Sequence, residues 1–233
     1  KWFLAMYLIS AHKKGISSCQ LARDLDITQT TAWFLLHKIR TLFAQEGCKL
    51  KDVVECDEVY LGGKETNKHE SKKTKGTQGR STKTKTPVFG MVERGGIVFA
   101  QKVKDAKSET LKPIIRKFVL EGSMVCTDEL SAYAGIGNGN YVHRVVHHGQ
   151  KEFVDGDAYT NTIEGVWSML RRMVVGVYHY ISSKYLQRYL DESVFRYNIR
   201  EMRPGENRAS DRFEAMFKRA ACVVDYEGVR CVA

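Results

Sequence analysis

Residues 52–63 read DVVECDEVYLGG, a β-branched and aromatic run that ends at a pair of glycines. Such a run predicts a β-strand, and the glycines can turn the chain out of it. Four of its residues are acidic. Lys51, the residue just before the run, is basic. Carboxylates gathered in one strand repel each other unless a cation neutralises them. The strand is therefore a candidate metal-binding element.

Beyond this strand, apolar patterns predict four more strands and three helices. The strands are expected at 88–93, 97–104, 123–130 and 141–146, and the helices at 108–120, 161–175 and 184–200. Pro113 places the start of the first of these helices near Leu111. The order β-β-β-α-β-β-α-α predicts an α/β fold of the ribonuclease H-like class, with a mixed five-stranded sheet and flanking helices.

The first 48 residues are expected to form a small all-α region. Apolar residues recur there at helical spacing. Ser17 or Ser18 can cap the first of two short helices, and Thr28 can cap the second. This pattern is typical of a helix-turn-helix, in which the start of the second helix reads base edges in DNA. We expect that role for Gln29, Thr30 and Thr31. An ordinary helical hairpin gives the same pattern.

The charge of the chain is uneven. Over 233 residues the formal net charge is +10, and residues 64–86 hold eight Lys or Arg against two Glu with no apolar residue. This segment predicts a solvated basic loop whose Lys72, Lys73 and Lys75 contact DNA phosphates. A loop that only keeps the protein in solution has the same composition.

Several classes of protein are excluded by composition. No apolar run approaches the roughly 20 residues that a membrane span needs. The six cysteines are scattered and include no C-x-x-C pair, which excludes a disulfide scaffold and gives no zinc site. We expect a cytoplasmic protein, associated with the nucleoid if the source is bacterial.

Three acidic residues fall where the expected fold brings the ends of its elements together. Asp57 lies in the first strand, Asp128 ends the fourth, and Glu164 lies in the first turn of the helix at 161–175. Converging carboxylates can hold a pair of Mg²⁺ or Mn²⁺ ions for phosphodiester chemistry. Each also has a structural interpretation: Asp57 as an exposed strand residue, Asp128 as a helix cap, and Glu164 as the partner of Asn161 in a capping box.

Two arginines follow on the same helix. Arg171 lies seven residues after Glu164, on one helix face and about 10 Å away. A guanidinium there can hold a DNA phosphate beside the metal, and Arg172 is expected to contact DNA as well. A solvated arginine on an amphipathic helix is the alternative interpretation.

Five segments in order resemble the insertion-sequence DDE transposases related to the eukaryotic Merlin elements, the ISXO2-like transposase domain. They are ECDEVYLGGK, TPVFGMVERGG, CTDELSAY, NTIEGVWSMLRR and YLQRYLDESVFRYNIR. The resemblance implies that Asp57 and Asp128 are the two catalytic aspartates and that either Asn161 or Glu164 is the third member. Arg171 stands where the family usually has Lys. The resemblance also implies a zinc ribbon ahead of the helix-turn-helix, which we expect to be absent or trimmed here.

These observations together predict a transposase. We expect a helix-turn-helix at 1–48, a catalytic domain at 49–203 and a C-terminal tail at 204–233, with a short helix in the stretch DRFEAMFKRA. The expected activity is metal-dependent cleavage and strand transfer at the ends of an insertion sequence, with double-stranded DNA (terminal inverted repeats and target) as partner. Two ends must be handled together, which implies a homodimer in a synaptic complex. The alternatives are a transposase-derived DNA-binding protein that does not cut, and a ribonuclease H-like nuclease or resolvase.

Overall fold

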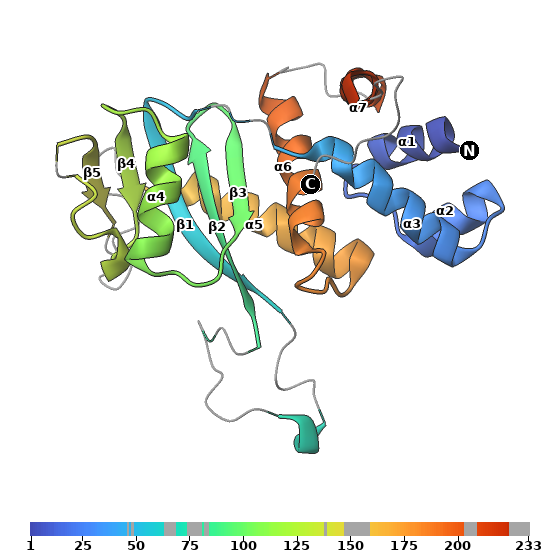
Figure 1. Cartoon of the computed structure of the whole chain (residues 1–233), viewed down its shortest axis with the longest axis horizontal. Coiled ribbons are helices and arrows are strands. Elements are labelled where there is room, and N and C mark those ends of the chain that lie inside the picture. The colour runs from blue at the N-terminus through green and yellow to red at the C-terminus, as the bar shows by residue number, and fades with distance from the viewer. Residues whose placement is uncertain are drawn as a thin grey trace.

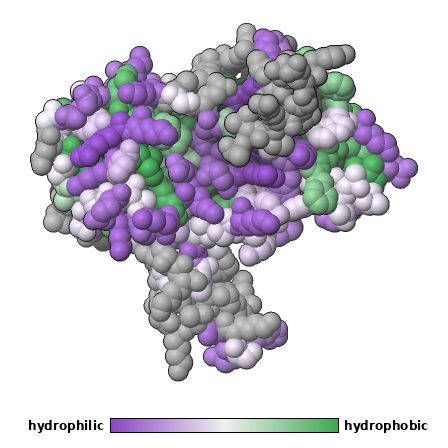
Figure 2. Space-filling model, in the orientation of Figure 1, coloured by the Kyte–Doolittle hydropathy of each residue, from purple (hydrophilic) through white to green (hydrophobic). Residues whose placement is uncertain are grey.

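The computed structural model describes most of the chain. The described residues are 1–45, 47, 49–62, 69–73, 81, 84–137, 139–146, 159–202 and 209–223. Within them, no helix is both long and apolar enough to cross a membrane. On the face drawn in Figure 2, hydrophilic residues cover most of the surface and hydrophobic residues form small patches between them.

Five strands form one mixed sheet in the order β3-β2-β1-β4-β5. Antiparallel pairs join β1 to β2 and β2 to β3, while β4 runs parallel to β1 and β5 parallel to β4. The strands are β1 (Val53–Leu61), β2 (Thr86–Glu93), β3 (Val98–Lys102), β4 (Met124–Thr127) and β5 (Val142–Val145). This strand order, with helices on both faces, is the ribonuclease H-like arrangement that the element order predicted.

Helices cover both faces of the sheet because apolar residues point to each face in turn along its strands. Figure 1 shows α4 (Ser108–Phe118) in front of the sheet, α5 (Asn161–Met173) behind it, and α6 (Leu186–Met202) beside β3. In β1, Val54 and Cys56 pack in the cluster that contains α4, and Val59 packs in the cluster that contains α5 and α6. Glu55 and Asp57 are therefore on the α5 side of the strand, since alternate residues share a face.

The helix α4 begins earlier than the sequence predicted. It starts at Ser108 and includes Pro113, whereas Pro113 was expected to delay the start to about Leu111. Proline at this position removes a single hydrogen bond, to the carbonyl of Glu109 four residues back. Glu109 is exposed, so water can take the place of that bond. Burial of Leu111 and Ile115 against the sheet outweighs the loss.

The N-terminal helices are α1 (Trp2–Ala11), α2 (Ser18–Leu25) and α3 (Gln29–Arg40). The side chains of Ser17 and Thr28 cap α2 and α3 by accepting backbone hydrogen bonds, as expected from the sequence. These helices share one hydrophobic cluster with α6 and with α7 (Ala209–Val223), the helix predicted in the C-terminal tail. Both ends of the chain thus contribute to one core. The proposed boundaries at residues 48 and 203 stay predictions.

A buried ionic network links α3 to α6. Glu192 is fully buried and accepts hydrogen bonds from Arg40 Nε and Arg196 Nη2, each at 2.8 Å. Tyr178 donates a third at 3.0 Å. Burial by itself would raise the pKa of Glu192, but the two guanidinium groups outweigh burial and lower it. The carboxylate is therefore held in its charged form between two helices.

Glu192→Ala is expected to lower the free energy of unfolding by about 3–5 kcal/mol, because it leaves two buried guanidinium groups without their partner. The matched control is Glu214→Ala, which breaks the ion pair with Lys218 on the surface of α7, where both side chains are more than half exposed. That change should cost less than about 1 kcal/mol. Urea unfolding measures both, and equal losses would contradict a structural role for the network.

Candidate active site

Asp57 and Asp128, the first two predicted carboxylates, lie where β1 extends beyond the end of β4. Pairing between these strands ends at Glu55 and Cys126, and β1 continues to Leu61 with β2 alone beside it. Asp128 follows directly after β4 and lies beside the part of β1 that β4 does not pair with. Carboxylate oxygens of Asp57, Glu58 and Asp128 all lie within 4.8 Å of one another. The sequence prediction that Asp57 and Asp128 converge agrees with this placement.

Glu58 is a member of this cluster that the sequence analysis did not select. Adjacent strand residues point to opposite faces, so Asp57 and Glu58 were not expected to share a site. They do so here because β4 does not pair with β1 beyond Glu55, so that side of β1 is open to both faces of the sheet. Glu58 accepts a hydrogen bond from the Tyr133 hydroxyl on the α4 side of the sheet. The only sequence signal was the density of acidic residues in the strand.

Asp57 is held in a partly buried environment, and no cationic side chain among the described residues pairs with its carboxylate. Trp167 Nε1, on α5, donates a hydrogen bond of 2.9 Å to Asp57 Oδ2. Burial raises the pKa of Asp57 to about 6, and the charges of Asp128 and Glu164 add to the rise, although the Trp167 hydrogen bond opposes it. The ionised cluster is therefore electrostatically unfavourable by itself, which is the condition that a divalent cation relieves.

The helix cap predicted as the structural role of Asp128 is wrong, because the N-cap of the short helix at Ser131–Tyr133 is Leu130 and no side chain caps that helix. Its Oδ1 accepts a hydrogen bond of 3.0 Å from the backbone N–H of Leu130, at the turn that follows β4. This bond fixes the carboxylate at the end of the strand. This turn hydrogen bond and metal binding are compatible because a carboxylate has two oxygens and several acceptor positions.

Glu164 and Asn161 lie about 60° apart around the first turn of α5. Glu164 is exposed and outside the 4.8 Å group, but it is close enough to Asp57 for its charge to raise the pKa of that residue. The capping box proposed for Asn161 and Glu164 is wrong: the N-cap is Thr160, Asn161 is the first helical residue, and no side-chain cap is made there. Another residue performs that function.

That residue is Glu55, two positions before Asp57 on the same face of β1. Its Oε2 accepts hydrogen bonds from the N–H groups of Thr162 at 2.9 Å and Ile163 at 3.1 Å, and its Oε1 accepts one from Thr162 Oγ1 at 2.9 Å. Arg94 Nε donates to Oε1 at 2.7 Å. The carboxylate is fully buried, so the strand itself caps the helix that carries Glu164.

Arg171 and Arg172 diverge although they are neighbours. Arg171 is exposed and lines a cavity of about 270 Å³ with Gly62 and Thr86, the points where the chain leaves β1 and enters β2. Arg172 is also exposed, and its Nη1 donates to Ser168 Oγ at 2.8 Å. Arg172 lines a separate groove on another face of α5.

The remaining predicted DNA contacts lie away from the carboxylates in sequence. Gln29, Thr30 and Thr31 are exposed at the start of α3, and Gln29 Nε2 donates to Ser18 Oγ at 2.8 Å. Lys73 pairs with Glu70 at 2.5 Å in the short described part of the basic segment. Lys75 and most of residues 64–86 lie outside the described residues, and so does the side-chain exposure of Lys72.

The chemistry of the cluster fits a hard divalent cation. Its donors are carboxylate oxygens, which Mg²⁺ and Mn²⁺ prefer, and no cysteine or histidine belongs to the group among the described residues. Asp57 and Asp128 would be ligands, with Glu58 or Glu164 able to complete the set. The arrangement suits metal-assisted chemistry on a phosphodiester.

The sequence pattern of the ISXO2-like transposase domain matches residues 49–198. The chain belongs to this family. A protein of the transposable element ISH50 from Halobacterium salinarum is 29% identical over 180 residues, which are 74% of this chain and 60% of that protein. A transposase-like protein of Haemophilus influenzae is 28% identical over 46% of this chain and 85% of its own length. The chain thus spans only about three fifths of the first relative.

Two solved structures resemble the chain more distantly. The HTLV-2 integrase catalytic core domain in complex with magnesium is 13% identical, covers 73% of this chain and 99% of its own, and has a TM-score of 0.38. The simian T-cell lymphotropic virus intasome in complex with the PP2A subunit B56 gamma is 16% identical, with coverage of 73% and 63% and a TM-score of 0.34.

Glu55→Gln is expected to lower the free energy of unfolding by about 1.5–3 kcal/mol, since it replaces charge-assisted hydrogen bonds to Arg94 and to the α5 N–H groups with neutral ones. Asp52→Asn is the matched control. Asp52 precedes β1, is exposed and has a φ of 60°, which Asn tolerates, so its loss should stay within about 0.5 kcal/mol. Urea unfolding in the absence of divalent metal measures both; a Glu55 variant as stable as the control would remove Glu55 as the anchor of α5.

Proposed function

We propose that this chain cleaves DNA and transfers strands at the ends of an insertion sequence, using divalent metal ions. The observation that carries the proposal is the convergence of Asp57 and Asp128, whose carboxylate oxygens lie within 4.8 Å of one another in a transposase-family domain. Asp57 lies in β1 and Asp128 directly follows β4, the strand parallel to β1. Their meeting at one sheet edge is what such chemistry requires.

Asp57, Asp128 and Glu164 are the proposed metal ligands, for two Mg²⁺ ions or for Mn²⁺ in their place. When bound, such ions would activate the attacking hydroxyl group and neutralise charge on the leaving oxygen. The contribution of the chain is to hold its carboxylates in position. Trp167 orients Asp57 by a hydrogen bond, and Glu55 fixes the turn of α5 that carries Glu164.

The DNA contacts are proposed on three parts of the chain. Arg171 would hold a phosphate near the carboxylates, and the basic segment at 64–86, which leaves the sheet beside Arg171, would hold others. The exposed start of α3 would read bases through Gln29, Thr30 and Thr31. Because transposition acts on two ends, the working unit is proposed to be a homodimer in a synaptic complex on double-stranded DNA. The relation to Merlin elements and a place in the bacterial nucleoid stay predictions.

Asp57→Asn is expected to abolish metal-dependent DNA cleavage while DNA affinity stays close to that of the wild type, because a neutral amide is a poor Mg²⁺ ligand but leaves the DNA contacts in place. Metal binding is measured separately by thermal unfolding. Wild type should gain about 2.7 kcal/mol at a Mn²⁺ concentration 100-fold above its dissociation constant, and the variant should gain much less. Glu109→Gln, at an exposed position on α4, serves as the control and should behave as wild type. Normal cleavage by Asp57→Asn would refute the assignment.

A cleavage assay with labelled DNA distinguishes the possible activities. With DNA that carries the ends of the encoding element, joined products support a transposase, cut products without joining support a nuclease or resolvase, and binding without reaction supports a DNA-binding protein that does not cut. The last two outcomes overturn the proposed strand transfer.

Glu164→Gln and Asn161→Ala distinguish the two candidates for the third ligand. Glu164 is the residue whose charge acts on Asp57, so Glu164→Gln should remove activity under Mg²⁺. Asn161 is exposed and makes no cap, so Asn161→Ala should change stability by less than about 0.5 kcal/mol and leave cleavage chemistry intact. Single-turnover cleavage rates measure both variants. An active Glu164→Gln together with an inactive, folded Asn161→Ala would move the ligand to Asn161.

A further inference from the structure

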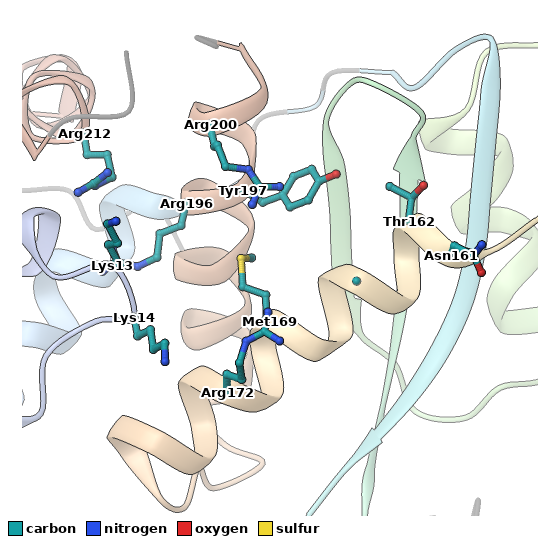
Figure 3. A pocket seen from close by; sticks show the side chains of 11 residues that line it. Lys13, Lys14, Asn161, Thr162, Met169, Arg172, Arg196, Tyr197, Arg200 and Arg212 are labelled. Carbon is teal, nitrogen blue, oxygen red and sulfur yellow. The ribbon is translucent and has the colours of Figure 1, made fainter. Parts of the chain in front are cut away.

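A basic groove of about 610 Å³ lies on a different face of α5 from the one that carries Glu164, between α5, α6, α7 and the connection from α1 to α2. Figure 3 shows its lining side chains, with Asn161 and Thr162 at one end and the cationic side chains gathered toward the other. None of the described residues that line it is acidic. Its basic residues are Lys13, Lys14, Arg172, Arg196, Arg200 and Arg212.

Two of these arginines fix the wall of the groove. Arg196 donates to the carbonyls of Ile9 at 2.7 Å and His12 at 2.8 Å, and Arg212 Nε donates to the carbonyl of Ser10 at 2.6 Å. These carbonyls end α1, where cationic groups are favourable. Both guanidinium groups are largely buried, so this part of the groove is held rigidly.

The other four basic residues present exposed side chains along this wall. Lys13 and Lys14 follow α1 directly, Arg172 ends α5, and Arg200 lies near the end of α6 beside the ring of Tyr197. They come from three separate parts of the sequence. The fold therefore assembles the positive charge, and no single run of basic residues in the chain predicted it.

The groove and the carboxylate cluster use different faces of α5. Asn161, Gly165, Met169 and Arg172 recur at steps of four, four and three residues, which places them on one face. At about 100° per residue, Glu164 lies some 60° to one side of that face's first residue, and Arg171 lies about 100° away from Arg172. A molecule in the groove thus contacts a face of α5 different from the one that carries Glu164 and Arg171.

Positive groups placed this closely favour an anion. Burial lowers the pKa of Arg212, and the charge of Arg196 lowers it further, which shows that the cations repel one another. From Asn161 to Arg172 the groove follows α5 for about 16 Å, at 1.5 Å per residue. One strand of duplex DNA places about five phosphates along that length, at about 3.4 Å of rise each.

We propose that the groove binds the phosphate backbone of a stretch of DNA separate from the stretch that is cut at the carboxylates. The proposal rests on the proposed action on DNA, and it adds a second DNA path that includes both ends of the chain. The shared chemistry is that of a phosphate polyanion. A small phosphate compound is the other source of that chemistry, and the experiments below separate it from DNA.

The first experiment compares two triple variants that remove the same charge. Lys13→Gln, Lys14→Gln and Arg200→Gln remove exposed cations from the groove, and Lys107→Gln, Arg116→Gln and Lys117→Gln remove exposed cations from α4, on the other face of the sheet. Fluorescence anisotropy with a 30-base-pair duplex gives the slope of log affinity against log salt. The groove variant should lose up to about 2.7 in slope, at about 0.9 per phosphate contact. Equal slopes in the two variants overturn the proposal.

The second experiment uses the unaltered protein and so does not depend on how the variants fold. Acetylation of lysine by an N-hydroxysuccinimide ester, read by mass spectrometry, should slow at least fivefold at Lys13 and Lys14 when the duplex is present, with Lys107 and Lys117 unchanged. Pyrophosphate at the same phosphate concentration should not protect. Protection by pyrophosphate as strong as by DNA, or no protection by DNA, overturns the proposal. Neither readout requires cleavage, so a chain that fails to cut DNA can still pass both.

Discussion

The candidate active site depends on one buried carboxylate, Glu55, which joins the central strand of the sheet to the first turn of α5. Its two oxygens accept from two backbone N–H groups, one threonine hydroxyl and Arg94. A buried charge is tolerated only when it is paired and fully hydrogen-bonded, and this one is. Arg94 also donates to the carbonyl of Tyr159 at 2.8 Å, so the chain that enters α5 is tied to the same pair. The separation between Asp57 and Glu164 follows from this junction.

Glu55 and Asp57 show how the same residue class serves two purposes two positions apart on one strand face. Glu55 has a guanidinium partner at 2.7 Å and a helix N-terminus, which together stabilise its charge. Asp57 has a neutral indole N–H and two carboxylates near it, and burial raises its pKa to about 6. Within the part of the chain that the structure describes, Glu55 thus has a countercharge and Asp57 has none. An unfavourable ionised group that the fold leaves in place is typical of a functional site, where a ligand supplies what the protein does not.

Much of the fold was predictable from local sequence because the signals were local. The caps at Ser17 and Thr28 and the alternation in β1 each depend on a few neighbouring residues, and the element order then gives the sheet topology. The failures depend on partners far away in the chain. Glu58 joined the cluster because β4 stops short, and the cap on α5 came from a strand more than 100 residues earlier. The groove is of the same kind, since its cations converge only after α1, α5, α6 and α7 pack together.

The packing of α6 joins the N-terminal helices and α7 to the sheet. Glu192 binds Arg40 of α3 through one oxygen and Arg196 through the other. Arg196 also donates hydrogen bonds to the carbonyls that end α1. The same helix packs against the sheet through Leu190 and Val194, and Asn198 hydrogen-bonds both backbone groups of Val98 in β3. One rigid element therefore contacts the sheet on one side and α1 and α3 on the other. Because Arg196 and Arg200 belong to this element, the charged wall of the groove keeps a fixed position relative to α5, and through α5 relative to the carboxylates.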